Sequence, residues 1–64
     1  MDAETLFCTA LAQVESESIR AWAGSDHNRP LFVRIAQRVI ERVDSQAEIV
    51  DRMATVILCE AMGF

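Results

Sequence analysis

The chain has 64 residues, of which 52% are hydrophobic and 25% are charged, and its net charge is −4 at pH 7. This composition is that of a globular protein and excludes a disordered chain, and so short a chain is expected to be one domain, residues 1–64. Ten carboxylates against six arginines and no lysine disfavour nonspecific binding to nucleic-acid phosphates. The absence of lysine indicates a GC-rich coding sequence and favours a bacterial or phage source.

The small size predicts that the fold needs additional stabilisation. A domain of this length buries only about 60% of the surface that its unfolded chain exposes, and such domains usually depend on disulfides, a metal ion or a second copy. Cys8 and Cys59 cannot form a disulfide framework, and no CxxC or HxxxH spacing indicates zinc. We therefore expect a homodimer with neither a metal nor a cofactor.

The N-terminal residues MDAETLFCTALA are acidic where a signal peptide would be basic. The longest strongly apolar stretch, ATVILC, is far shorter than the roughly 20 residues that a membrane span requires. The expected location is therefore the cytoplasm, without membrane contact and with both cysteines reduced.

Residues 3 to 23 are predicted to form one helix. Asp2 is placed to cap it, and Glu4 puts a carboxylate in the first turn, where the helix dipole is positive. A stripe at helical spacing consists of Phe7, Leu11, Val14, Ser18 and Ala21, with Leu6, Ala10 and Trp22 beside it. We expect Gly24 to end the helix in the left-handed conformation that glycine commonly adopts there.

A turn then precedes a second predicted helix, over residues 30 to 43. Asn28 is its expected N-cap, and Pro30 suits its first turn, where a missing N–H group leaves no hydrogen bond unmade. Apolar residues recur at helical spacing, at Leu31, Phe32, Ile35, Ala36, Val39, Ile40 and Val43. Trp22 lies beside the turn, where we expect it to cover one end of the bundle and to pack against Phe32.

Two alternatives are open for the rest of the chain. The segment from Ser45 to Glu48 matches the S-x-x-E capping box, which predicts a break near Asp44 and a third helix over residues 46 to 62. No glycine or proline intervenes, however, so the alternative is one continuous helix over residues 30 to 62, about 50 Å long. The capping signal favours the break.

The segment from residue 47 to 62 is apolar well beyond one helix face. A helix that is apolar nearly all round is buried nearly all round, and the other helices of so short a chain are too few to enclose it. We therefore predict that this segment forms the dimer interface, through Val50, Met53, Ala54, Ile57, Leu58, Ala61 and Met62. Phe64, after Gly63, is expected to fold back on the last turn.

Ser25, Asp26 and His27 stand side by side but do not predict a catalytic triad. Three consecutive side chains fan outward, whereas a nucleophile, its base and an orienting carboxylate converge from separate parts of a fold. Hydrogen bonding within a turn explains them instead. Neither arrangement of the helices brings Cys8 and Cys59 together, so they are predicted to be small buried hydrophobic residues. We predict no enzymatic activity.

Arg34, Arg38 and Arg42 form a ridge at i, i+4 and i+8. The simplest interpretation is a solvated helix face, with Arg38 paired to Glu41 and with Asp44 also diluting the positive charge. The functional interpretations are a contact line for an acidic protein partner and, second, for nucleic-acid phosphates. The break after residue 43 lacks the glycine of a helix-turn-helix, and no basic recognition helix follows it.

The sequence therefore predicts an all-α protein, a helical hairpin or three-helix chain that forms a four-helix-bundle-like homodimer. The favoured function is that of a small, non-enzymatic regulatory protein that binds another protein of unspecified identity. It would bind through the arginine ridge or through a groove lined by Met53, Ile57 and Met62. The alternative is a dimeric nucleic-acid-binding regulator that uses the arginine ridges of both subunits.

Overall fold

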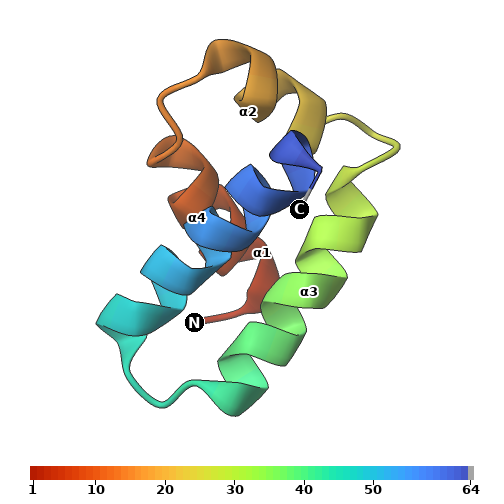
Figure 1. The fold of residues 1–64 in the computed structure, drawn as a ribbon. Coiled ribbons are helices and arrows are strands. Elements are labelled where there is room, and N and C mark those ends of the chain that lie inside the picture. Colours follow the sequence, from red (N-terminus) through yellow and green to blue (C-terminus); the bar gives the residue numbers. More distant parts are fainter. Residues whose placement is uncertain (64) are drawn as a thin grey trace.

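The computed structural model describes residues 1–63, and within them four helices follow one another (Figure 1). The helices are α1 (Ala3–Ala12), α2 (Glu17–Ala23), α3 (Arg29–Arg42) and α4 (Gln46–Met62). No strand occurs in the same range, so the predicted all-α class is confirmed. The expectation that Phe64 packs on the last turn falls outside the described residues.

The first helix packs against both long helices. α1 contacts α3 and α4, while α2 lies over the C-terminal end of α4 (Figure 1). One core joins all four helices: Ala3, Leu6, Phe7, Ala10, Val14, Ala23, Phe32, Ala36, Val39, Ile49, Met53 and Ile57. Each large apolar side chain buried here contributes roughly 1.5–3 kcal/mol relative to leaving it exposed.

The predicted single helix over residues 3 to 23 is wrong, because the chain leaves the helical path between α1 and α2. Ser16 adopts an extended backbone, and its hydroxyl oxygen accepts a hydrogen bond from the N–H of Ile19 at 3.3 Å. A serine that bonds a main-chain N–H three residues ahead begins a helix and does not continue one. The Arg20 guanidinium donates to the carbonyl oxygen of Val14, which lies outside the helical ladder. The bend buries Val14 and turns α2 over the end of α4.

The turn between α2 and α3 does not depend on a left-handed glycine. Gly24 has φ −85° and ψ 0°, a right-handed conformation, so the expectation of a left-handed cap is wrong there. The carbonyl oxygen of Trp22 instead accepts hydrogen bonds from Ser25 Oγ and Asn28 Nδ2, each at 2.9 Å. Asn28 occupies the N-cap position of α3 but makes no capping bond with its side chain.

The break expected near Asp44 and Ser45 is present, and the continuous helix over residues 30 to 62 is not. Val43 ends α3 with φ −115° and ψ 123°, and Ser45 precedes α4 with a similarly extended backbone. The Ser45 side chain makes no capping hydrogen bond. The capping box therefore marks the right position, although the bond it implies is not formed. The break folds α4 back beside α3 (Figure 1).

Candidate partner-binding groove

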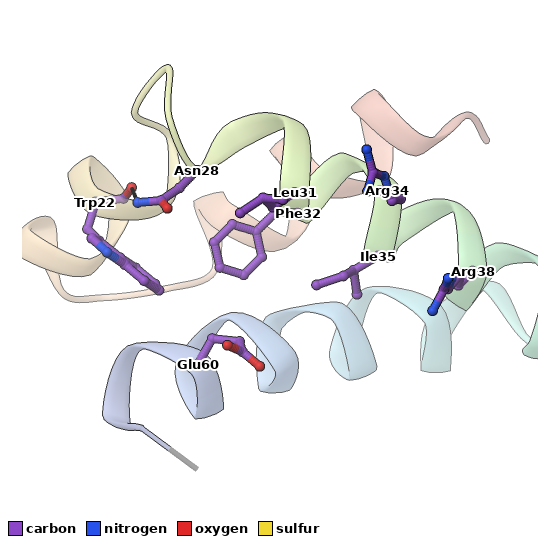
Figure 2. Close-up of a pocket in the computed structure, with 8 residues that line it drawn as sticks. All are labelled: Trp22, Asn28, Leu31, Phe32, Arg34, Ile35, Arg38 and Glu60. Carbon is purple, nitrogen blue, oxygen red and sulfur yellow. Dashed lines mark hydrogen bonds between the residues drawn. The ribbon is translucent and has the colours of Figure 1, made fainter.

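A groove lies along the α3–α4 pair and consists of two adjoining hollows. The first has a volume of ≈ 380 Å³ and is lined by Trp22, Asn28, Leu31, Phe32, Arg34, Ile35, Arg38 and Glu60 (Figure 2). The second has a volume of ≈ 250 Å³ and is lined by Ile35, Arg38, Val39, Arg42, Val43 and Arg52. Because they share Ile35 and Arg38, the two hollows form one surface feature, here called the α3–α4 groove.

The apolar floor of the groove follows from the helical spacing of α3. Phe32 and Val39 are buried in the core. Leu31 lies one position before Phe32, and Ile35 lies four positions before Val39, so both lie at the edge of the buried face. Leu31 is 50% exposed. The edge of the core thus continues outward as the floor of the groove.

Trp22 closes the end of the groove near the start of α3. Its ring meets Phe32 edge-on, with ring centroids 5.5 Å apart and an angle of 75° between the planes, so the contact expected from the sequence is present. Phe32 in turn stacks on Phe7 at 6.0 Å. The hydrogen bonds to the Trp22 carbonyl hold this part of the backbone, yet the residue is 39% exposed. An indole held on one side and open to water on the other is available for contact.

The arginine ridge borders the groove, and α4 adds a fourth arginine to it. Arg34, Arg38 and Arg42 come from α3, and Arg52 comes from α4. Figure 2 shows Arg38 extending toward α4 and Arg34 extending to the other side of α3. Sequence reasoning missed Arg52 because it lies on a different helix, and only the fold brings it near Arg42 and Val43.

These four arginines are exposed and have no ion-pair partner among residues 1–63. The ion pair in that part of the chain joins Arg29 and Glu4, with 3.4 Å between Nη2 and Oε2. The pair expected between Arg38 and Glu41 is not formed, and the Glu41 carboxylate accepts a hydrogen bond from Gln37 instead. α3 therefore presents positive charge on a chain whose net charge is −4.

Glu60 places a negative charge at the opposite end of the groove from Arg42 and Arg52. It is an exposed residue of α4 and lies below Trp22 and Phe32 in Figure 2. Glu60 and Arg52 are eight positions apart, so they share one side of α4. The spacing of Arg52 and Glu60 can be read from the sequence, but the sequence does not indicate that this side of α4 faces α3.

The predicted dimer interface is not a continuous exposed surface. Met53 and Ile57 are 0% exposed and belong to the core of this chain, so the prediction is wrong for them and for the partner groove that they would line. Leu58 and Met62 are 38% and 67% exposed. Val50, Ala54 and Ala61 are half-buried. The reason is the break between α1 and α2, which lets α1 pack along α4 while α2 covers its end.

The Ser25, Asp26 and His27 segment is a turn, and the Ser25 hydroxyl donates a hydrogen bond to the Trp22 carbonyl oxygen.

The prediction that both cysteines are buried is wrong for Cys8, which is exposed on α1, while Cys59 is half-buried. Within residues 1–63, no cluster of histidine, cysteine or carboxylate side chains has the geometry to hold a metal ion.

None of the helices in the described range has the length and apolar character that a membrane crossing requires. The α3–α4 groove combines an apolar floor with charged side chains from two helices. Comparison of the chain with models of known protein families, with curated proteins and with solved structures found no match.

Proposed function

We propose that this chain is a non-enzymatic, regulatory protein-binding module that holds an acidic segment of another protein in the α3–α4 groove. The observation that carries the proposal is the combination of an apolar floor with four arginines that have no ion-pair partner within residues 1–63. An arginine guanidinium presents a planar fork of donors that matches a carboxylate. Side chains of mixed apolar and acidic character would satisfy both parts of the surface.

Charge complementarity favours a different protein over a second copy in this groove. A two-fold axis through the groove would set the same patch of each copy against itself. Each copy would bring the same four arginines and one glutamate, so two positively charged surfaces would face each other, and like charges repel. An acidic partner segment reverses the sign of these contacts.

The apolar floor also favours protein over nucleic acid. Phosphates engage basic side chains without needing Leu31, Ile35 or Val43, whereas leucine-like side chains of a partner protein would bury these residues. Nucleic-acid binding through Arg34, Arg38 and Arg42 is therefore an outcome that the test must distinguish.

The test is a fluorescence titration that follows Trp22, the single tryptophan of the chain. The probe is a synthetic amphipathic peptide with leucines on one face and glutamates beside them. We expect saturable binding that weakens when glutamine replaces the glutamates. Arg38→Ala and Arg42→Ala should each weaken binding by up to about fivefold at low salt, as expected for exposed charge pairs.

Thr9→Glu is the matched control, because it changes the net charge by the same amount at an exposed position of α1 outside the groove. No binding of the acidic peptide by the native chain, or equal weakening by Thr9→Glu, would contradict the proposal. Tight, arginine-dependent binding of a DNA or RNA oligonucleotide in place of the peptide would assign the ridge to nucleic acid.

We further propose that the chain forms the expected homodimer, and that it does so through the part of α4 that remains exposed. Leu58 and Met62 are one turn apart, and the half-buried Ala54 and Ala61 border them. Sedimentation equilibrium across a wide concentration range tests this, with Leu58→Glu expected to shift the equilibrium toward monomer. A native chain that stays monomeric throughout would contradict the dimer and leave the groove proposal standing.

A further inference from the structure

The charged residues at the two ends of the α3–α4 groove differ in sign. Glu60 lies at the Trp22 end, where Arg34 also borders the hollow but extends to the other side of α3 (Figure 2). Arg38 lies where the two hollows meet, and Arg42 and Arg52 lie at the far end. A groove of uniform charge would accept a partner in either direction. This groove distinguishes the two ends of whatever lies in it.

The walls of the groove indicate the secondary structure of its occupant. Both walls are helices, whose main-chain groups are hydrogen-bonded internally, so they offer no sheet edge to which an extended peptide could add. A helix satisfies its own main chain and presents side chains to an apolar floor. α3 has 14 residues and is therefore about 21 Å long, which matches a helix of about four turns.

The helix dipole relates the charges of the groove to the direction of that helix. A helix carries a partial positive charge at its N-terminus and a partial negative charge at its C-terminus. Glu60 therefore favours the N-terminus of the occupant, and Arg42 and Arg52 favour its C-terminus. Acidic side chains in its C-terminal half would also lie near these arginines, whereas in the reverse direction they would approach Glu60.

We propose that the occupant of the groove is an acidic amphipathic helix that lies parallel to α3, with its N-terminus at the Trp22–Glu60 end. A large apolar side chain from its first turn enters the ≈ 380 Å³ hollow beside Trp22. Its carboxylates lie over Arg38, Arg42 and Arg52. This inference rests on the proposed function and adds the conformation and direction of the partner.

The test compares two stapled helical peptides of 14 residues, with the same composition and with blocked ends. Both carry leucines at a symmetrical i, i+4, i+7, i+11 spacing. The first has one lysine in its N-terminal half and three glutamates in its C-terminal half, and the second has the reverse order. The second peptide can bring its glutamates over the arginines only by reversing its direction and thus its helix dipole. Titrations that follow Trp22 fluorescence should therefore give the first peptide tighter binding by up to about fivefold, as expected for a helix dipole beside exposed charges.

The double variant Glu60→Arg with Arg52→Glu exchanges the charges at the two ends while the net charge stays the same. Both residues are exposed, so the fold should be retained, which far-ultraviolet circular dichroism would verify. This variant should lose or reverse the preference between the peptides. The control Thr9→Glu with Gln13→Arg, also neutral overall and at exposed positions outside the groove, should keep it.

Equal binding of both peptides to the native chain, or tighter binding of the second, would overturn the direction and leave the proposed function intact. If the exchanged variant still prefers the first peptide as the native chain does, the role of Glu60 and Arg52 is overturned. Failure of both peptides to bind would instead contradict the proposed function itself.

Discussion

Arg20 and Val14 are joined across the break between α1 and α2, because Nη1 of Arg20 donates a hydrogen bond to the main-chain carbonyl oxygen of Val14. Val14 is 2% exposed, and Arg20 is half-buried beside it. The bond satisfies a carbonyl group that has left the helix, and it holds α2 at the angle that places Trp22 at the end of the groove.

Replacing Arg20 by methionine keeps most of the aliphatic stem and removes the donor. We expect the free energy of unfolding, measured by urea denaturation, to fall by about 1–2 kcal/mol, since a hydrogen bond from a charged donor is lost at a partly buried carbonyl. Arg34→Met, at an exposed position, should change it by less than about 0.5 kcal/mol. Equal effects of the two substitutions would show that the bond contributes no stability.

Met53 and Met62 should respond very differently to truncation, because one lies in the core and the other is 67% exposed. Met53→Ala leaves a cavity in the core and should lower the free energy of unfolding by about 2–5 kcal/mol. Met62→Ala should change it by less than about 0.5 kcal/mol at concentrations where the chain is monomeric. A small effect at Met53 would contradict its assignment to the core of this chain.

Asp2 gives the stability a dependence on acid pH. The main-chain N–H of Thr5 donates to Oδ1 of Asp2 at 2.7 Å, and this bond lowers the pKa of Asp2 below its ordinary value of 3.8. Because the folded-state pKa is the lower one, the contribution is present above pH 3.8 and is lost as the pH falls through the folded-state value.

Asp2→Asn keeps an N-cap acceptor that does not titrate. Urea unfolding of both proteins, from neutral pH down to about pH 2, should therefore show a shallower loss of stability for Asp2→Asn over the acid range. Parallel curves for the two proteins would mean that another group is responsible.

Gly63 and Gly24 should differ in their tolerance of alanine. Gly63 ends α4 with φ 83°, in the left-handed region, and an added Cβ atom would meet no neighbouring atom within 4 Å. Gly63→Ala should lower the free energy of unfolding by about 1 kcal/mol through the backbone alone. Gly24 needs no such conformation, but its added Cβ atom would lie 3.1 Å from the carbonyl oxygen of Arg20.

For Gly24→Ala we therefore expect a smaller loss, with the outcome set by whether that contact relaxes. Thermal unfolding followed by circular dichroism would compare the two variants. A larger loss for Gly24→Ala would show that the close contact with Arg20 outweighs the left-handed backbone at Gly63.

The helix ends that could be predicted are those marked by local residues. The Asn28–Pro30 pair and Ser45 stand at the starts of α3 and α4, where these residue types are preferred, although neither the Asn28 nor the Ser45 side chain makes a capping bond. The break after α1 could not be predicted, because local residues do not mark it clearly. Val14 continues the apolar spacing of α1, no glycine or proline marks the bend, and the Ser16 signal lies inside a run that otherwise suits a helix.

The groove could be predicted only in part. The spacing of Arg34, Arg38 and Arg42 placed them on one ridge, because that relationship lies within a single helix. Arg52 and Glu60 join them through the packing of α4 against α3, which depends on the tertiary structure. The apolar surplus of α4 predicted burial nearly all round, which is wrong within this chain, because its buried residues are Ile49, Met53 and Ile57 along one stripe.

α1 packs against both α3 and α4, yet it is the first of the four helices that the ribosome makes. Leu6 and Phe7 belong to α1, while the α4 members of the core, from Ile49 onward, are made more than 40 positions later. During synthesis these side chains have no native partner until α3 and α4 have emerged, so the nascent chain displays its most apolar surface early. Folding must then close one long loop, and the core forms only when translation of α4 is nearly complete.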